Sequence, residues 1–341
     1  MTKAFITGIS GTALSSAERR FIAAERPWGF ILFRRNVEAP SQAITLISEL
    51  RDTLGEANAP VMIDQEGGRV QRLQPPHWPV YPAGVVFGRL YDIDPVLGLA
   101  AARLSARLIA DDLSKLGINV DCLPLADVPV AGADTVIGDR AYGNDPAKVA
   151  AIARAVTEGL EQGGILPVLK HIPGHGRAAA DSHIELPSVD ASESELDRTD
   201  FAAFRPLADL PMAMTAHVVF TALDPAHPAT TSATMIEKVI RGSIDFQGLL
   251  MSDDVSMNAL AGTLAERTAA IFAAGCDMVL HCNGKLEEMC EVAGATPELT
   301  GRAKERAAAA LTLSMTPLPF DRKAARADLD ALIERAGAAH A

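Results

Sequence analysis

The chain has 341 residues, with 31 Lys and Arg against 43 Asp and Glu, so its formal net charge is −12. This acidic balance argues against a protein that binds the phosphate backbone of nucleic acids, and we expect no nucleic-acid partner. Hydrophobic residues make up 48% of the chain and aromatic residues only 5%, which favours a core of small aliphatic side chains in helices packed around a parallel sheet.

The N-terminus and the cysteines indicate a cytoplasmic protein. The opening MTKAFITGISG has no basic region followed by a long apolar core, as a secretion signal would have. No apolar run approaches the ~20 residues that cross a bilayer, so we expect no membrane partner. The four cysteines at 122, 276, 282 and 290 show no C-x-x-C spacing, and reduced thiols are typical of cytosolic proteins.

Eight short apolar runs have the composition of strands, and segments of helical composition separate most of them. The predicted strands are 4–8, 29–33, 60–64, 119–123, 165–170, 212–217, 248–253 and 277–281, and the predicted helices between them are 41–54, 97–116, 146–159, 195–207, 233–241 and 263–273. Strands that alternate with helices pair in parallel. Eight such repeats favour a closed barrel. The alternative is an open doubly wound sheet, and the absence of a G-x-G-x-x-G motif after any predicted strand argues against it.

The predicted fold class is therefore α/β, a single-domain (β/α)8 TIM barrel with extra C-terminal helices. We place the barrel, as the catalytic domain, at residues 1–295. Residues 296–341 are rich in Ala, Arg and Glu, with a breaker at TPLPF (316–320). They predict a helical extension, with helices at 299–314 and 322–336, that packs on the outside of the barrel.

Polar side chains gather at the C-terminal ends of the predicted strands, which is where (β/α)8 barrels carry their catalytic residues. Asp64 follows the third strand in IDQEGGRVQR. It could pair with Arg72 and hydrogen-bond a polyhydroxylated ligand, or it could simply cap the turn beside solvated arginines. Arg140, in IGDRAYGND after the fourth strand, would by itself be an ordinary solvated loop residue.

The densest group of titratable residues is the stretch KHIPGHGRAAADSH after the fifth strand. Lys170 and His171 directly follow an apolar run, where a lysine is costly unless it meets a ligand or a carboxylate, and a buried structural Lys–Asp pair is the alternative. Asp181 and His183 form a D-x-H arrangement in which the carboxylate can orient and polarise the imidazole for acid/base work. His175, between two glycines, could belong to the site or bond only to the loop backbone.

The seventh predicted strand ends in LLMSDD, and its period of two puts alternate residues on opposite faces. Only one of Asp253 and Asp254 can then point into the mouth of the barrel. The other would be free to cap the following turn or helix. Periodicity alone does not decide which of the two faces the mouth.

A metal-dependent hydrolase is one competing hypothesis, because His171, His175, Asp181 and His183 could ligate zinc. Their spacing matches no common zinc motif. We therefore expect neither a metal nor a cofactor.

Several of these motifs together resemble the family 3 glycoside hydrolases. They are IDQEGGRVQR, KHIPGHG, the D-S-H of the same loop, SDDVSM, and AHVVFTALDPAHPAT at 216–230. The resemblance runs in register from about Gly8 to about Gly284. It is closest to the single-domain β-N-acetylglucosaminidases of bacterial peptidoglycan recycling. It implies a retaining exo-β-N-acetylglucosaminidase that removes terminal non-reducing β-linked N-acetylglucosamine from anhydromuropeptides.

The resemblance also implies roles for individual residues. The aspartate that follows Ser or Thr on this strand is the family's nucleophile, which selects Asp253 over Asp254. The D-x-H loop makes His183 the general acid/base and Asp181 the residue that orients and polarises it. Residues that match the family's binders of sugar hydroxyls are Asp64, Arg72, Arg140, Lys170 and His171.

Retention of configuration requires a carboxylate beneath the anomeric carbon and a proton donor at the leaving oxygen. Asp253 would attack and form a glycosyl-enzyme. His183 would protonate the departing sugar and then deprotonate water, with Asp181 favouring the imidazolium form. The only expected partner is the small-molecule substrate, and a monomer is expected. A β-glucosidase-type or phosphorolytic family member and a non-enzymatic carbohydrate-binding relative are the alternatives.

Overall fold

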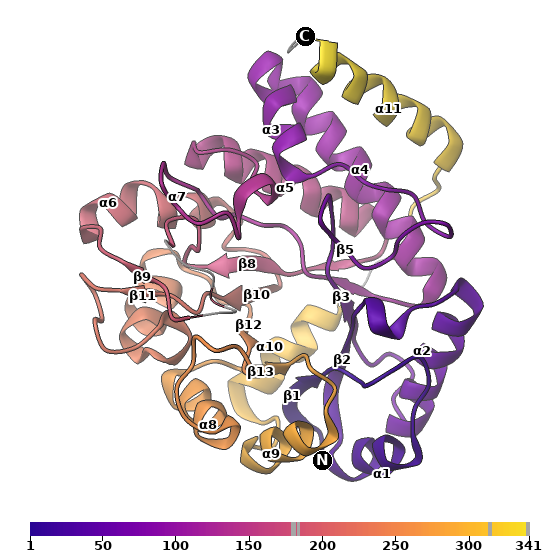
Figure 1. Cartoon of the computed structure of the whole chain (residues 1–341), viewed down its shortest axis with the longest axis vertical. Helices are drawn as coiled ribbons and strands as arrows, with labels where there is room; N and C mark the ends of the chain where they lie inside the picture. Colours follow the sequence, from indigo (N-terminus) through magenta and orange to yellow (C-terminus); the bar gives the residue numbers. More distant parts are fainter. Residues whose placement is uncertain (179–181, 183–184, 313–315, 339–341) are drawn as a thin grey trace.

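The computed structural model describes residues 1–178, 182, 185–312 and 316–338. Within them, parallel strands form a nearly closed barrel with helices on its outside (Figure 1). In the order in which they pair, the strands are β7 (Leu166–Pro167), β6 (Val120–Asp121), β3 (Val61–Ile63), β2 (Pro27–Leu32), β1 (Lys3–Thr7), β13 (Met278–His281), β12 (Leu249–Asp254), β10 (Met212–Thr215) and β8 (Leu169–Ile172).

The fifth predicted strand is split into β7 and β8, which are consecutive in the chain and separated only by Val168. The backbone N–H of Val168 donates to the carbonyls of Asp121 and Leu123, and that of Lys170 donates to Pro124. β7 and β8 are the two ends of the sheet in this order. The bonds connect the chain at both of these strands to the fourth strand and the residues just after it, and so bring the two ends of the sheet together. The predicted (β/α)8 barrel is confirmed, and the doubly wound alternative is wrong.

Helices connect the strands and cover the outside of the sheet. They are α1 (Ser16–Glu25), α2 (Pro40–Leu54), α3 (Gly84–Ile93), α4 (Pro95–Leu116), α5 (Pro146–Gln162), α6 (Glu193–Arg198), α7 (Asp200–Phe204), α8 (Leu264–Ala274) and α9 (Leu286–Ala295), with a π-helix at Met235–Ser243 where 233–241 was predicted. The sequence did not predict α1, although Ser15 and Glu18 close a capping box at its start. None of the helices in the described part of the chain is long and apolar enough to cross a membrane.

The period of two along each strand separates two hydrophobic cores. Alternate residues, such as Met251 and Leu280, form the core inside the barrel, whereas Leu250 packs outward against the helices. Ala307 and Ala310 of α10 (Gly301–Thr312) belong to the inner core. In Figure 1 this helix lies behind the ring of strands, and it closes the barrel at the N-terminal ends of the strands.

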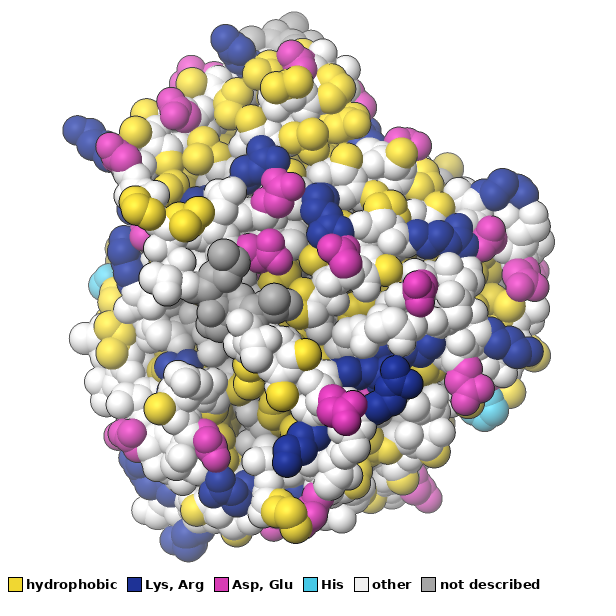
Figure 2. Space-filling model, turned by 180° about the vertical axis from the view of Figure 1, so that it is seen from behind, with side chains coloured by type: hydrophobic (Ala, Val, Ile, Leu, Met, Phe, Trp, Pro, Cys, Tyr) yellow, Lys and Arg dark blue, Asp and Glu magenta, His cyan; other side chains and the backbone are white. Residues whose placement is uncertain are grey.

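The last helix, α11 (Arg322–Ala338), lies beside α3 and α4 (Figure 1). Arg322 pairs with Asp111 at 2.6 Å and with Asp112 at 2.8 Å, and Leu329 is buried. Figure 2 shows the opposite side of the molecule, where hydrophobic side chains gather at the upper end and charges of both signs are interspersed below. The boundary between the barrel domain and the C-terminal extension, placed after residue 295, stays a prediction.

Two small additional sheets lie among the loops after the barrel strands. Directly after β3, β4 (Gln65–Gly67) and β5 (Val70–Gln71) form an antiparallel hairpin. Its turn needs glycine, because φ is +100° at Gly67 and a Cβ there would lie 2.3 Å from the carbonyl oxygen of Pro82. The second sheet pairs β9 (Ser188–Val189) with β11 (Val219–Phe220).

Candidate active site

A cavity of about 410 Å³ opens at the C-terminal ends of the barrel strands. Its floor includes Ile31, Met214 and Leu280, which belong to the inner core of the barrel. All six of the predicted site residues that the structure describes line it, namely Asp64, Arg72, Arg140, Lys170, His171 and Asp253. The other two, Asp181 and His183, lie outside the described residues.

Asp64 binds two cations in the wall of this cavity. Its Oδ1 lies 3.0 Å from Nζ of Lys170, and its Oδ2 accepts a 2.9 Å hydrogen bond from Nη2 of Arg72. Burial alone would raise the pKa of Asp64, but Lys170 and Arg72 outweigh it and hold that pKa well below its usual range. Burial would likewise lower the pKa of Lys170, yet the facing carboxylates raise it above its usual value. Both groups are therefore charged at neutral pH.

Glu66 is a second carboxylate in this network, and sequence reasoning missed it. Its Oε1 lies 2.6 Å from Nζ of Lys170, and both of its oxygens accept hydrogen bonds from Arg140, at 2.7 and 2.9 Å. Burial opposes ionisation, but Arg140 and Lys170 lower the pKa of Glu66 to about 2. The signal was present in D-x-E, because side chains two residues apart point to the same side of extended backbone.

His171 is oriented by Asp127, another carboxylate that the sequence did not single out. Nδ1 of His171 lies 2.7 Å from Oδ2 of Asp127, and Oδ1 of Asp127 accepts a 2.7 Å bond from the backbone N–H of His175. Asp127 is fully buried. Burial would raise its pKa, but His171 and these hydrogen bonds lower it. With Nδ1 committed to Asp127, Nε2 is the nitrogen of His171 that is available to a ligand in the cavity.

The two aspartates at the end of β12 have different surroundings. Oδ1 of Asp254 accepts from the backbone N–H groups of Ser256 and Cys282, both at 3.1 Å, and its Oδ2 accepts from the Ser256 hydroxyl at 2.6 Å. This carboxylate therefore holds the turn after the strand. Asp253 lines the cavity two residues after Met251, whose side chain points into the barrel, and its Oδ1 accepts from the backbone N–H of Asp254 at 2.7 Å.

His217, in the stretch AHVVFTALDPAHPAT, supports these aspartates from the sixth strand position. Its Nε2 lies 3.0 Å from the carbonyl oxygen of Asp254, and its Nδ1 lies 2.7 Å from the hydroxyl of Thr230. Burial lowers the pKa of His217. A neutral ring suits this pair of contacts, because it donates from one nitrogen and accepts at the other.

His175 is buried, and its ring Nε2 lies 3.0 Å from the hydroxyl of Ser182, the residue between Asp181 and His183 in the sequence. Burial and the neighbouring His171 lower the pKa of His175 to about 4, so the ring is neutral at pH 7.

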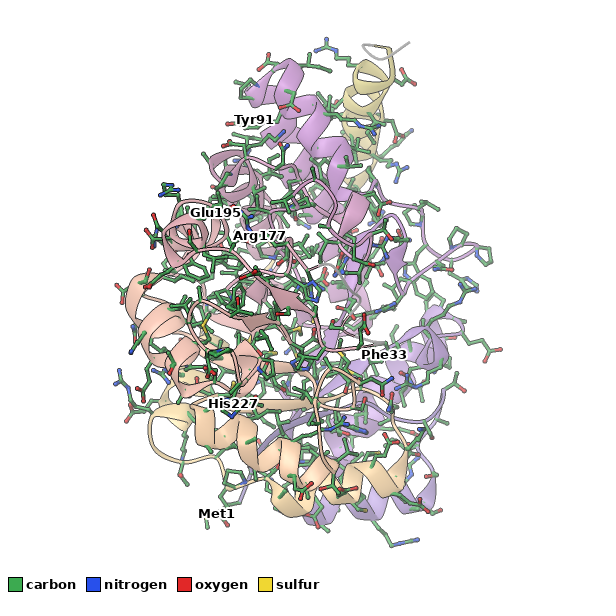
Figure 3. The ribbon with its side chains drawn as sticks, turned by 60° about the vertical axis from the view of Figure 1, so that its left-hand side comes forward. Met1, Phe33, Tyr91, Arg177, Glu195 and His227 are labelled. Carbon is green, nitrogen blue, oxygen red and sulfur yellow. The ribbon has the colours of Figure 1, made fainter. Side chains whose placement is uncertain are left out.

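Two residues later, Arg177 pairs with Glu195 at 2.8 Å, and these two labelled side chains lie side by side in Figure 3.

Phe33, labelled in Figure 3, follows β2 and also lines the cavity. The guanidinium carbon of Arg72 lies 5.2 Å from the centre of its ring, within the range of a cation–π contact. In a chain with few aromatic residues, Phe33 gives the site an apolar wall beside its charged network. No pattern in the sequence pointed to it.

Within the described ranges, no group of three or more His, Cys, Asp or Glu side chains is arranged to hold a metal ion. Two of the four residues considered for zinc, Asp181 and His183, are outside those ranges. What the described side chains offer is a set of fixed hydrogen-bond donors and acceptors around a dead-end cavity, with a carboxylate at its edge. That arrangement can bind a polyhydroxylated ring and place one of its carbons near a nucleophile.

Comparison with known proteins identifies the family. The profile of the glycosyl hydrolase family 3 N terminal domain matches residues 6–310. The chain belongs to glycosyl hydrolase family 3. It is therefore an enzyme, a glycoside hydrolase, and the recognition made from its motifs is confirmed.

Individual family 3 relatives cover most of the chain. A beta-hexosaminidase of Alkalilimnicola ehrlichii is 41% identical and aligns over 81% of this chain and 79% of its own length. The crystal structure of NagZ from Neisseria gonorrhoeae in complex with N-trifluoroacetyl-D-glucosamine superposes with a TM-score of 0.88 at 31% identity, over 97% of this chain and 98% of that one. A family 3 beta-N-acetylglucosaminidase from Paenibacillus superposes with a TM-score of 0.82 at 29% identity, over 98% of this chain and 66% of that one.

Proposed function

We propose that this family 3 enzyme is a retaining exo-β-N-acetylglucosaminidase that removes terminal non-reducing N-acetylglucosamine from peptidoglycan fragments in the cytoplasm. The observation that carries the proposal is the convergence of Asp64, Lys170, His171 and Asp253 on one dead-end cavity. The sugar assignment is supported by the relatives, among them the beta-hexosaminidase of A. ehrlichii and the gonococcal NagZ bound to N-trifluoroacetyl-D-glucosamine.

The shape of the cavity supports exo-cleavage. Its volume of about 410 Å³ lies in the usual range for small-molecule sites, and its floor is the packed interior of the barrel. A chain of sugars cannot pass through such a floor, which favours the binding of a terminal ring. Asp64, Arg72, Arg140, Lys170 and His171 supply both acceptors and donors, as ring hydroxyls require.

Asp253 is the proposed nucleophile. The carboxylate of Asp254 already accepts three hydrogen bonds, two from Ser256 in the turn after β12 and one from the backbone N–H of Cys282 after β13, which favours Asp253 as the group that attacks the anomeric carbon. Attack would form a glycosyl-enzyme with inverted configuration, and its hydrolysis would invert the configuration again, giving net retention.

His183, assisted by Asp181, is the proposed acid/base. As an imidazolium it would protonate the leaving oxygen, and as a neutral imidazole it would then take a proton from the attacking water. The Asp181 carboxylate would favour the imidazolium form in the first step. These two assignments rest on the family motif D-S-H.

Hydrolysis of 4-nitrophenyl N-acetyl-β-D-glucosaminide, followed by NMR of the first-formed sugar, tests the activity and its stereochemistry. The proposal requires turnover with release of β-N-acetylglucosamine, and free sugar rather than a sugar 1-phosphate in phosphate buffer. It also requires release of N-acetylglucosamine from an N-acetylglucosaminyl-anhydromuropeptide. Equal rates on the glucoside that lacks the N-acetyl group would instead favour a β-glucosidase.

A further inference from the structure

Glu66 contacts two cations of the candidate active site without lining the cavity itself. Lys170 and Arg140 both face the cavity, whereas Glu66 lines a small internal space behind them, with Gly67 and Phe87. The Glu66 side chain is only 6% exposed. A ligand in the cavity therefore meets the two cations and not the carboxylate that holds them.

One oxygen of Glu66 bridges the two cations. Its Oε1 lies 2.6 Å from Nζ of Lys170 and 2.7 Å from Nη2 of Arg140, while its Oε2 accepts a 2.9 Å hydrogen bond from Nε of Arg140. Two buried cations this close repel each other unless an anion lies between them. The bidentate contact also fixes the plane of the guanidinium group.

The geometry also limits where Lys170 can donate. An ammonium group has three N–H donors. In Lys170 one of them donates to Oδ1 of Asp64 at 3.0 Å, and Nζ also forms an ion pair with Oε1 of Glu66 at 2.6 Å. Because Lys170 lines the cavity, its ammonium can also donate to a ligand hydroxyl.

We propose that Glu66 is a positioning residue for this reaction, which sets the spacing and orientation of Lys170 and Arg140 around the sugar. The inference rests on the proposed function, because it takes the ligand of the cavity to be a sugar. Asp64 differs from Glu66 in that it lines the cavity, where it can accept a hydrogen bond directly from a sugar hydroxyl. Replacing Glu66 would keep every sugar-contacting side chain in the sequence, but it would release Lys170 and Arg140 from their common anchor.

The test is Glu66→Gln, which keeps the size of the side chain but loses the charge. Its amide nitrogen cannot accept a hydrogen bond. In the position of Oε2 it removes the acceptor of Arg140 Nε, and in the position of Oε1 it removes the shared acceptor of Lys170 and Arg140 Nη2. A displacement of about 1 Å in a binding group can cost 10²-fold in rate. We expect kcat/KM for 4-nitrophenyl N-acetyl-β-D-glucosaminide to fall by on the order of 10²-fold, and calorimetry to show weaker binding of N-acetylglucosamine. Both are measured well below the melting temperature of the variant.

A double-mutant cycle with Lys170→Met separates positioning from general loss of stability. If Glu66 acts through its cations, Glu66→Gln lowers kcat/KM by a smaller factor in the Lys170→Met background than in the wild type, because only Arg140 is then left to be released. The matched control is Glu158→Gln, which breaks a surface ion pair with Arg103 (Glu158 is 40% exposed) and is expected to leave kcat/KM unchanged. A loss below tenfold in Glu66→Gln, or a loss in the Lys170→Met background as large as the loss in the wild type, overturns the inference.

Two further measurements keep the outcome decisive. If Glu66→Gln does not fold, Glu66→Asp keeps the charge on a side chain too short to bridge both cations, and it should still lower kcat/KM at least tenfold. The proposed function is tested separately by the wild-type enzyme. Wild-type turnover with an unaffected Glu66 variant contradicts this inference alone. A wild-type enzyme that neither hydrolyses the substrate nor binds N-acetylglucosamine contradicts both.

Discussion

The Lys170→Met substitution probes the charged network from its centre. The Lys170 side chain is 2% exposed, and its ammonium faces Asp64 and Glu66. Removing one partner of a buried ion pair typically costs about 3–5 kcal/mol. Because Asp64 keeps Arg72 and Glu66 keeps Arg140, we expect the lower end, a fall of about 3 kcal/mol in the free energy of unfolding at pH 7.

This destabilisation should depend on pH in a defined direction. The pKa of Glu66 is lowered from 4.5 to about 2 in the folded protein. A lowered carboxylate pKa contributes stability that is present above the unfolded pKa and is lost as the pH falls through the folded value. Lys170 supplies part of that lowering. The difference in the free energy of unfolding between wild type and Lys170→Met, called the gap below, should therefore be largest above about pH 5 and shrink toward pH 2.

Urea unfolding at pH 7, 5 and 3, followed by fluorescence of the buried Trp28 and Trp78, measures this gap. Lys115→Met is the matched control, because Lys115 is 61% exposed in its pair with Asp111, and exposed pairs of this kind contribute only about 0.3–0.5 kcal/mol. A gap for Lys170→Met below about 1 kcal/mol at pH 7, or one that does not change between pH 7 and pH 3, would refute the reasoning.

Three further substitutions test the histidine and aspartate assignments. Asp127→Asn removes the carboxylate that orients His171, and a charge-assisted hydrogen bond of about 1.5–3 kcal/mol corresponds to a fall of roughly 10–150-fold in kcat/KM. Unchanged steady-state kinetics in that variant would contradict the role of Asp127. Asp254→Asn should lower the melting temperature and reduce kcat/KM by less than about tenfold, whereas Asp253→Asn should cost at least about 10³-fold. The reverse order of these two losses would move the nucleophile to Asp254.

The sequence was informative wherever a short-range pattern decides the geometry. Apolar runs of strand length marked the eight strand positions, and the polar residues at their C-terminal ends did meet in one cavity, as parallel strands in a barrel require. The alternation in LLMSDD predicts one aspartate at the mouth of the barrel, whereas both Asp253 and Asp254 line the cavity. The surroundings of Asp253 and Asp254 differ because Asp254 holds a turn with Ser256 and Cys282, which periodicity could not show.

What the sequence did not show depends on contacts between distant residues. Asp127 looks like an ordinary loop residue until the fold brings it to His171, 44 positions later. Glu66 belongs to a hairpin that follows from the left-handed conformation of Gly67, and only the closed barrel places it between Lys170 and Arg140. His175 could not be given a role from spacing, because its contact with the hydroxyl of Ser182, seven residues later, exists only in the folded chain.

The central claim, a covalent intermediate on Asp253, can be tested directly by trapping. A 5-fluoro analogue of an activated N-acetylglucosaminide should react faster than its adduct hydrolyses, because fluorine destabilises the oxocarbenium-like transition state and the good leaving group compensates only in the first step. Peptic digestion and mass spectrometry should then find one sugar attached to the peptide that contains Asp253, and fragmentation should place it on that residue. A sugar on Asp254, or an unlabelled enzyme that still turns the analogue over, would contradict the account.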